Sequence, residues 1–478
     1  MKWLTNPFVL DLRSLSALRI GLGLVLLVDL YIRWGDLGAH YSEEGVLPLH
    51  VLFQYHWLPN FFSVYLIGNS PFWAHLLMAC NTLCLVAMAL GYRTRLFTVL
   101  SWVFLVSIQN RNGLVEQGGD DLLRLLVFWG MFLPWGAYFS YDTMYIPRAA
   151  PKYVSVAGIG YILLLFSLYF FSALLKNGAE WNKEYTALYY ALSLDMIVLP
   201  GGKMLYAYPN LMRVLTAFIY YLELFGPFLL FIPLRNELCR LLFVLLFLLM
   251  HLGIACTLYV GLFPFISIVA LVGLLPTSVW EFWTGMFKVK SQNTLMPLEE
   301  PAWKSSACTF LAVYCLYLNA VTVWPYELLL DQYVRPMAYL LRIDQKWGMF
   351  APTVFRDDGW FIMEANTPKG KIDIYDGGQS VCYQKPGSVV SKVKNDRWRK
   401  YQENILFVDK AYLRPYYCQW LGREWNKKAT LPFQVSSLEI VYMKEVTLPD
   451  FERPLVSREV LCSCILAPDT KQASLASH

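Results

Sequence analysis

Residues 153–175 read YVSVAGIGYILLLFSLYFFSALL, and Lys176 follows directly. A helix needs about 20 mostly apolar residues to cross the hydrocarbon core of a bilayer, so this stretch predicts a membrane-spanning helix with an amine at its edge. Burial makes the charged form of an amine costly, so such a lysine can act as a base. The alternative is a lysine that extends into the lipid headgroups and only anchors the helix.

The composition extends this interpretation to the whole chain. Of 478 residues, 57% are hydrophobic and only 16% are charged, whereas a soluble protein carries about 25% charged residues. The net charge of +5 is small, and no basic stripe indicates a nucleic-acid partner. These values predict a polytopic membrane protein.

About nine apolar segments are candidates for membrane spans. They are residues 15–34, 72–92, 96–110, 122–139, 153–176, 211–233, 238–260, 262–280 and 307–325. The basic residues of the connecting loops fall on one predicted side: Lys2, Arg13, Arg93, Arg95, Arg148, Lys152, Arg235, Arg240, Lys288 and Lys290. The positive-inside rule then predicts a cytoplasmic N-terminus, and nine spans place the chain after Pro325 outside. No cleavable signal peptide is evident, and the first apolar run, over residues 15–34, is long enough to span a membrane.

The chain changes character beyond residue 355. We expect a transmembrane domain over 1–325, a connecting segment over 326–355, an extracytoplasmic domain over 356–470 and a tail over 471–478. Residues 360–365 and 371–375 flank Pro368-Lys369-Gly370 and predict a β-hairpin, residues 438–443 a strand, and residues 397–417 a helix. The expected fold is an all-α membrane domain followed by a small β-rich α/β domain.

Ionisable residues inside a membrane are functional candidates. The predicted spans contain Arg19, Asp29, Arg124, Glu223 and His251. Charge pairing that holds helices together is the alternative for the first three. Glu223, four residues before Pro227, is either a packing carboxylate or a site residue. His251 is either a site residue or a buried histidine bonded to a neighbouring carbonyl.

Two outer loops can bring further groups to Lys176. Residues 109–121 are densely polar, and Asp120 is either a helix cap or part of a site at the membrane mouth. Residues 177–208 carry many aromatic side chains, including Trp181 and Tyr185. An interfacial aromatic belt explains such residues, and so does stacking on a flat lipid-soluble ring such as a quinone.

The cysteines and histidines carry less information. Cys382, Cys418, Cys462 and Cys464 lie in the predicted outer domain, where a disulfide can form, and their pairing is open. The six histidines and ten cysteines form no His-x-x-His or Cys-x-x-Cys pattern, so we predict no metal site.

The membrane region resembles the HTTM domain that is shared with vitamin K-dependent gamma-glutamyl carboxylase. The resemblance covers roughly residues 9–280 and is carried by DLRSLSALRIG at 11–21, Asn110-Arg111-Asn112 with Gly118-Gly119-Asp120, Lys176 with Glu180-Trp181, and Met250-His251 with Gly261-Leu262-Phe263-Pro264. Trp347-Gly348-Met349-Phe350-Ala351-Pro352 followed by Asp358-Gly359-Trp360 also looks like bacterial members of this group.

The resemblance implies a reaction and a set of site residues. Lys176 matches the family lysine that deprotonates a reduced quinone of the vitamin K or menaquinol type, and O2 then gives an epoxide and a strong base that supports carboxylation of glutamate by CO2. His251 matches a family histidine and would assist. Asp120, Glu180, Trp181, Tyr185 and Glu223 would orient the lysine or line the pocket. The chain departs from the family in its shorter outer region and in Gly119 and Asp120, so quinol oxygenation carries over better than peptide carboxylation.

Two other classes of function fit the sequence. A non-catalytic membrane scaffold or maturation factor for a secreted peptide or protein predicts that arginine can replace Lys176. A transporter or lipid-handling protein predicts that Arg19, Asp29 and Glu223 face one cavity through the bilayer.

Overall fold

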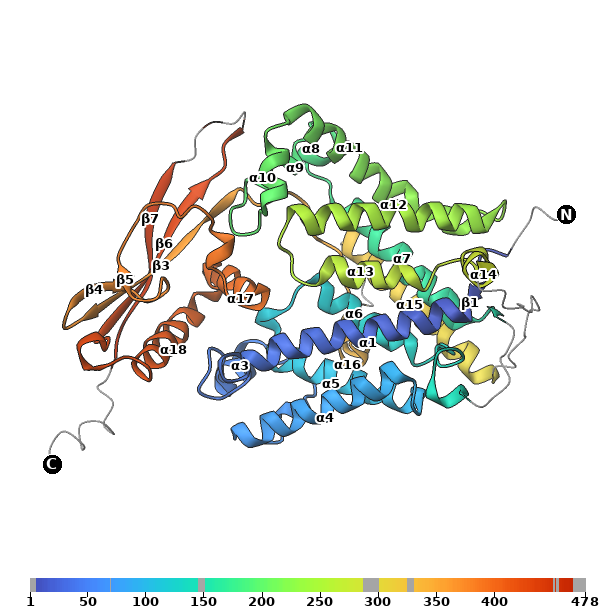
Figure 1. Cartoon of the computed structure of the whole chain (residues 1–478), viewed down its shortest axis with the longest axis horizontal. Coiled ribbons are helices and arrows are strands. Elements are labelled where there is room, and N and C mark those ends of the chain that lie inside the picture. The colour runs from blue at the N-terminus through green and yellow to red at the C-terminus, as the bar shows by residue number, and fades with distance from the viewer. Residues whose placement is uncertain are drawn as a thin grey trace.

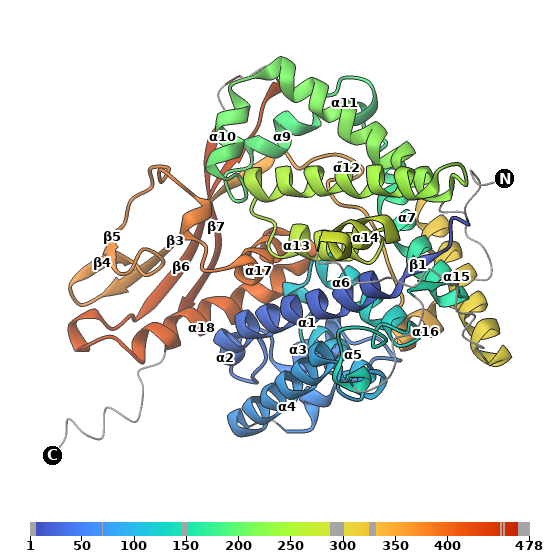
Figure 2. The ribbon, with the colours of Figure 1, turned by 45° about the vertical axis from the view of Figure 1, so that its right-hand side comes forward.

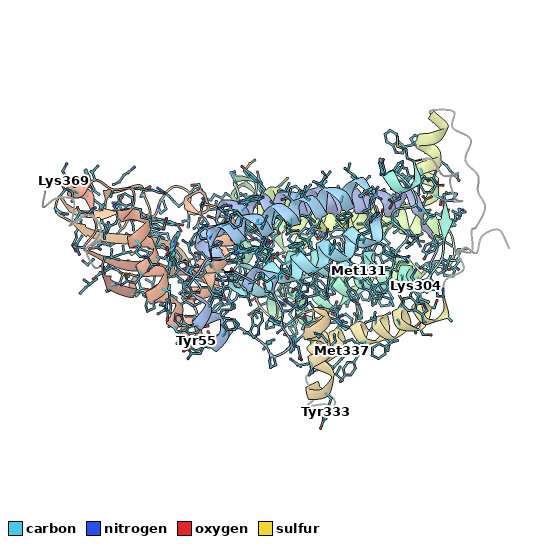
Figure 3. All side chains as sticks on the ribbon, turned by 90° about the horizontal axis from the view of Figure 1, so that it is seen from below. Tyr55, Met131, Lys304, Tyr333, Met337 and Lys369 are labelled. Carbon is cyan, nitrogen blue, oxygen red and sulfur yellow. A yellow bond between two sulfur atoms is a disulfide. The ribbon has the colours of Figure 1, made fainter. Side chains whose placement is uncertain are left out.

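The computed structural model describes residues 6–68, 70–144, 151–286, 301–324, 331–449, 452 and 455–466. Helices form an elongated bundle, and a β-sheet with two helices lies at one end of it (Figure 1). The N-terminus lies at the opposite end (Figure 1). From below, Lys369 marks the far tip of the sheet and Lys304 lies near the other end (Figure 3). We call the sheet end the distal end and the other the N-terminal end.

Most of the bundle consists of long apolar helices. They are α1 (Leu12–Gly35), α4 (Pro71–Leu90), α5 (Thr94–Arg111), α7 (Val156–Leu175), α11 (Pro209–Phe225), α12 (Asn236–Thr257) and α15 (Ala302–Val323). Shorter helices join or pack against them: α2 (Leu37–His40), α3 (Leu49–Tyr55), α6 (Gly118–Gly130), α8 (Ala179–Asn182), α9 (Ala187–Ser193), α10 (Pro200–Tyr206), α13 (Phe263–Val272), α14 (Thr277–Met286) and α16 (Asp331–Leu341). Helix α13 lies between α12 and α1 (Figure 2).

Nine spans are not confirmed. Among the described residues, six helices are long and apolar enough to cross a membrane: α1, α4, α7, α11 with its 3-10 extension to Phe231, α12 and α15. The number rises to seven if α13 and the start of α14, which meet at 83°, form one broken span. The coarser prediction of a multi-pass membrane protein holds.

Length and polarity explain the difference. The fourth expected span is α6, whose 13 residues extend about 20 Å at 1.5 Å per residue, less than the roughly 30 Å of a bilayer core. The third is α5, which has Arg95 near its start and the polar residues 109–111 at its end. The eighth divides between α13 and α14, because the chain turns sharply after Val272.

The basic connections gather at the N-terminal end. The short strands β1 (Leu10–Asp11) and β2 (Lys152–Tyr153) pair there, with Asp11 opposite Lys152. The Arg240 guanidinium donates to the Val9 carbonyl, and the Ser14 hydroxyl donates to the Leu275 carbonyl at 2.7 Å. The clustering of Arg13, Lys152 and Arg240 agrees with the expectation that these residues share one side.

The distal sheet is antiparallel throughout, in the order β5-β4-β3-β6-β7. Its strands are β3 (Asp357–Thr367), β4 (Gly370–Asp373), β5 (Gln379–Ser380), β6 (Ser437–Val446) and β7 (Val456–Ile465). The predicted hairpin is present as β3 and β4, and the predicted strand as β6. The chain therefore ends in the small sheet-containing region that the sequence indicates.

The single helix expected over 397–417 is wrong in its extent. The structure has two helices, α17 (Asp396–Leu406) and α18 (Arg414–Asn426), joined by a 3-10 turn over 408–413. Phe407 ends α17 in an extended conformation, and Pro415 stands in the first turn of α18, where its missing N–H costs nothing.

The apolar core of the distal region includes residues from the membrane half of the chain. Leu47, Leu114, Trp181 and Tyr190 pack in the same buried cluster as the inner face of the sheet. The loops at the distal end of the bundle and the sheet thus share one core. The expected tail over 471–478 lies outside the described residues.

Candidate functional site

Lys176 directly follows α7 and is buried, with 4% of its side chain exposed. Its ammonium is ion-paired with the Glu223 carboxylate of α11 and donates a hydrogen bond to the Ser172 hydroxyl at 3.2 Å. It also lies 4.8 Å from the ring centroid of Trp181. The amine is therefore held inside the protein, beside a carboxylate and over an aromatic ring.

The local helix geometry explains these contacts. Side chains on a helix lean toward its N-terminus, so the Lys176 amine reaches back to Ser172, one turn earlier. Glu223 lies on the inner face of α11, whereas Phe225 and Phe228 are exposed on the outside of the bundle. The ion pair consequently lies behind an exposed aromatic surface.

His251 belongs to a second polar pair. The Tyr169 hydroxyl of α7 is bonded to His251 Nε2 of α12 at 2.9 Å, and both side chains are almost fully buried. Glu223 interacts electrostatically with Tyr169, which places the two pairs in one polar cluster. We call Tyr169, Ser172, Lys176, Glu223 and His251 the α7 polar cluster.

The sequence indicated Lys176, Glu223 and His251 but missed Tyr169 and Ser172. Tyr169, Ser172 and Lys176 are three and four residues apart, which is the spacing of one helix face. That spacing was the available signal, and the apolar surroundings of Tyr169 obscured it. Lys176 and His251 are not directly bonded to each other. Tyr169 is bonded to His251 and lies on the same helix face as Lys176.

Glu180 and Trp181 tie the Lys176 turn to the segment that leads to the sheet. The Glu180 carboxylate accepts a hydrogen bond from the Val354 N–H and lies 3.8 Å from Arg356. The Trp181 indole donates to the Phe350 carbonyl at 2.9 Å. Trp181 thus contacts the amine, and Glu180 positions the chain around it.

Tyr185 lies farther out. Its hydroxyl is bonded to the Tyr221 hydroxyl at 3.0 Å in an exposed position, and its backbone has a positive φ of 55°. Tyr185 therefore makes its described contacts at the surface, as expected for an interfacial aromatic residue.

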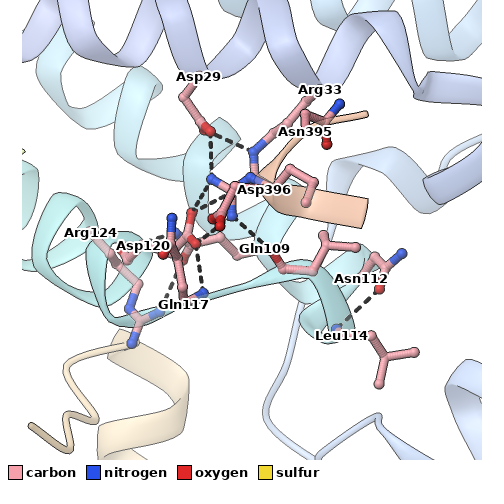
Figure 4. Close-up of polar contacts among 12 residues, drawn as sticks. Asp29, Arg33, Gln109, Asn112, Leu114, Gln117, Asp120, Arg124, Asn395 and Asp396 are labelled. Atoms are coloured by element: carbon pink, nitrogen blue, oxygen red, sulfur yellow. Dashed lines mark hydrogen bonds and ion pairs between the residues drawn. The ribbon is translucent and has the colours of Figure 1, made fainter. Parts of the chain in front are cut away.

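The described side-chain partners of Asp120 are arginines, and no described contact joins it to Lys176. Its carboxylate accepts from Arg33 at 2.6 Å and from both terminal nitrogens of Arg397 at 2.5 and 2.8 Å. Asp29 joins the same network through Arg33 at 2.8 Å and Arg397 at 2.5 Å (Figure 4). Arg397 lies on α17, so these carboxylates hold the distal region against the bundle.

The other ionisable residues of the bundle also have structural partners. Arg124 of α6 donates to Gln109 at 2.9 Å and to the Arg342 carbonyl at 2.7 Å. Arg19 donates to the Phe139 carbonyl at 2.5 Å near the N-terminal end. Arg19, Asp29 and Glu223 therefore belong to three different contact sets, and no described hydrogen bond or ion pair joins one set to another.

The pKa values of two groups near the junction with the sheet, Asp36 and His40, are shifted by their surroundings. Burial disfavours the charged form of Asp36, but hydrogen bonds from Lys394, Trp398 and Asn395 outweigh it and lower the pKa of Asp36. Burial lowers the pKa of His40 to about 3, and its ring lies 4.4 Å from that of Trp398. The junction thus combines a charged network with a neutral histidine.

The distal region contains one described disulfide and one described cavity. Cys418 of α18 is bonded to Cys464 of β7, and Cys382 and Cys462 are free. A cavity of about 300 Å³ lies beside β3, and its walls include Trp360, Asp373, Tyr375 and Lys385. None of the α7 polar cluster lines it.

Among the described residues, no group of three or more histidine, cysteine, aspartate or glutamate side chains is placed to hold a metal ion. No family model, no curated protein and no solved structure matches this chain.

Proposed function

We propose that this protein is a membrane enzyme related to the vitamin K-dependent carboxylases, and that it oxygenates a reduced quinone. The observation that carries the proposal is the buried ion pair of Lys176 with Glu223, next to Trp181 and behind the exposed aromatic face of α11. A reduced quinone dissolves in the bilayer and can reach such a site from the lipid. The residues therefore fit a flat, apolar molecule that carries acidic hydroxyl groups.

The pair suits removal of a phenolic proton. A hydroxyl that approaches Glu223 can donate its hydrogen bond to the carboxylate, and Lys176 stabilises the negative charge that remains on the substrate oxygen. The low dielectric of the buried site strengthens that stabilisation. A quinol that loses its proton there reacts with O2 to give the epoxide, and this reaction supplies a base for carboxylation by CO2 or for another proton abstraction.

The proposal includes a location. The N-terminal end, with its basic connections, would face the cytoplasm of the cell inner membrane, and the sheet would lie on the outer side. The partners are then the bilayer, the quinol and a peptide or protein on the outer face.

The test is quinol turnover by the purified full-length protein in lipid nanodiscs. Menaquinol or reduced vitamin K is supplied with O2 and CO2, and oxygen consumption and epoxide are measured. We expect Lys176→Ala to lower the rate by about 10²- to 10⁴-fold, the contribution of a positioned acid–base group. Lys152→Ala is the matched control, because Lys152 forms a partly exposed ion pair with Glu237.

Two results would count against the proposal. One is equal turnover by Lys176→Ala and wild type. The other is a folded wild-type protein that binds no quinol and forms no epoxide.

A membrane scaffold or maturation factor is the second candidate. The long edge strand β7 favours it, since Leu455, Val456 and Ile465 are exposed along that edge. Lys176→Arg separates the two candidates, because the larger planar guanidinium keeps the charge but cannot place it where the ammonium lies, beside Glu223 and over Trp181. A scaffold tolerates this change, whereas the enzyme loses turnover.

A further inference from the structure

Part of strand β3 has a partner strand on one side only. It pairs with β6 over residues 357–366. On its other side, β4 pairs only with residues 364–367, and β4 itself ends at Asp373. Among the described residues, no strand lies on this side of residues 357–362. We call this side of residues 357–362 the open edge of β3.

The backbone of Phe361 faces the open edge. Successive residues of a paired strand direct their N–H and C=O groups to alternate sides. Met363 directs its N–H to the Asp373 carboxylate and its C=O to the Ile374 N–H, both at 3.0 Å and both away from β6. Phe361 comes two residues earlier, so its N–H and C=O point the same way.

These two groups lack a described partner. Phe361 is only 6% exposed, and no hydrogen bond described outside the pairing of the strands involves its backbone. Buried backbone groups are almost always paired. The open edge therefore calls for a partner that offers one donor and one acceptor.

The distal cavity of about 300 Å³ lies against the open edge, because residues 359–362 line it. Trp360 contributes a second donor to this lining. Its side chain is buried, with 5% exposure, and its indole N–H has no hydrogen-bond partner among the described residues. The volume is at the lower end of the range for small-molecule sites, so the cavity fits a compact ligand of about one ring.

The charged side chains of the lining are already paired. Lys392 is ion-paired with Asp376, and both residues line the cavity. Lys385, which also lines it, is paired with Glu445 and Asp195. A charged ligand would find no free counter-charge there, so we expect an uncharged one. The paired carboxylates and ammonium groups still have acceptor and donor positions for hydroxyl groups.

We propose that the distal cavity binds an uncharged secondary amide that carries hydroxyl groups, the chemistry of an N-acetylated amino sugar. A secondary amide offers one N–H and one C=O, the same two groups that a neighbouring strand would present to Phe361. A hydroxyl oxygen of the ligand accepts from the Trp360 indole. None of the α7 polar cluster lines this cavity, so the proposal does not depend on quinol turnover.

The experiment compares three small probes on the full-length protein in nanodiscs. N-acetylglucosamine has the amide and the hydroxyl groups, glucose lacks the amide, and N-acetylglycinamide has amides but no hydroxyl groups. Calorimetric titration should show that N-acetylglucosamine binds about 10- to 100-fold more tightly than glucose, the combined effect of two hydrogen bonds. Hydrogen exchange over 357–362 should slow with N-acetylglucosamine and not with glucose.

Trp360→Phe tests the second donor. This change keeps an aromatic ring but removes the N–H, so binding of N-acetylglucosamine should weaken about tenfold. Trp425→Phe is the matched control in the same region, because the Trp425 indole donates to the Phe433 carbonyl at 2.9 Å and lies outside the lining. Equal losses in the two variants would count against the assigned role of Trp360.

The wild-type comparison decides the inference even if a variant fails to fold. Equal binding of N-acetylglucosamine and glucose, or no binding of N-acetylglucosamine, overturns it. N-acetylglycinamide that binds as tightly as N-acetylglucosamine also overturns it and assigns the cavity to a peptide. Epoxide formation that depends on Lys176 would leave the proposed function standing in each case.

Discussion

Glu223 changes the role of Lys176. A lone buried amine favours its neutral form, whereas a carboxylate in direct contact favours an ion pair. Removing one partner of a buried pair leaves an uncompensated charge, so Glu223→Gln should lower the free energy of unfolding by about 3–5 kcal/mol. Reversible unfolding in mixed micelles measures this change in the free energy of unfolding. The double variant Lys176→Met/Glu223→Leu should recover most of the loss, and unchanged stability of Glu223→Gln would contradict a buried ion pair.

The sequence could indicate each of these residues but not their pairing. Lys176 and Glu223 are 47 residues apart, and their contact depends on how α7 and α11 are rotated about their axes. Asp120 is a second residue whose partner the sequence could not reveal. Its partner Arg397 is 277 residues away in the distal region, so a polar loop next to a helix start could not reveal an anchoring role.

Asp358 at the start of β3 gives the protein a predicted pH dependence. Burial and the charge of Asp195 raise the pKa of Asp358 from 3.8 to about 7. Between about pH 4 and pH 7 the folded state therefore holds a proton that the unfolded state has released, and the free energy of unfolding falls as the pH rises. Asp358→Asn removes this contribution and keeps an oxygen for the Asp195 N–H.

The measurement for Asp358 is a pair of melting curves at pH 5 and pH 8. The wild-type melting temperature should fall more than that of Asp358→Asn between the two values. Other titrating groups, His40 among them, contribute equally to both proteins, so the difference isolates Asp358. Parallel changes in the two proteins would disprove the raised pKa.

Helix α17 joins the sheet to the bundle. Arg397 contacts Asp29 and Asp120, and Asn404 donates to the Leu114 carbonyl at 2.7 Å. Arg397→Met leaves two buried carboxylates with one cation fewer, so we expect a loss of about 3–5 kcal/mol. Hydrogen exchange over 396–406 should quicken as the helix detaches.

The matched control for Arg397 is Lys427→Met on α18. Lys427 pairs with Glu424 at 2.7 Å, but more than half of its side chain is exposed. Such surface pairs contribute about 0–1 kcal/mol, so this variant should behave like wild type. Equal effects of the two substitutions would show that the buried network does not hold the sheet in place.

Element boundaries followed the sequence where local signals were strong. The Pro368-Lys369-Gly370 turn predicted the β3–β4 hairpin, because its neighbours alternate as strand residues do. The apolar run after Asp121 was read to residue 139, but α6 ends at Gly130, where Trp135 packs against the helix. Pro134 and Gly136 follow within the same apolar run, so hydrophobicity alone could not locate that ending.

The two ends of the whole molecule differ in charge and in structure, and this difference predicts a topology. The basic connections lie with the N-terminus, and the sheet lies at the distal end (Figure 1). An odd number of crossings places the N-terminus and the sheet on opposite sides of a membrane. Seven spans satisfy this condition if α13 and α14 form one broken span, whereas six spans do not.

Thiol labelling tests whether the number of crossings is odd or even. Cys382 is free and exposed in the distal region, and Asn6 is exposed near the start of the described chain. Cys256 and Cys462 are also free and at least partly exposed, so both are first replaced by serine. In that background, a membrane-impermeant maleimide on intact spheroplasts should label Cys382, and the label should disappear in Cys382→Ser. In the Cys382→Ser background, Asn6→Cys should be labelled only after permeabilisation, because we expect the basic end to face the cytoplasm. Labelling of both positions in intact spheroplasts would mean that α13 and α14 form a re-entrant loop and that the crossings are even in number.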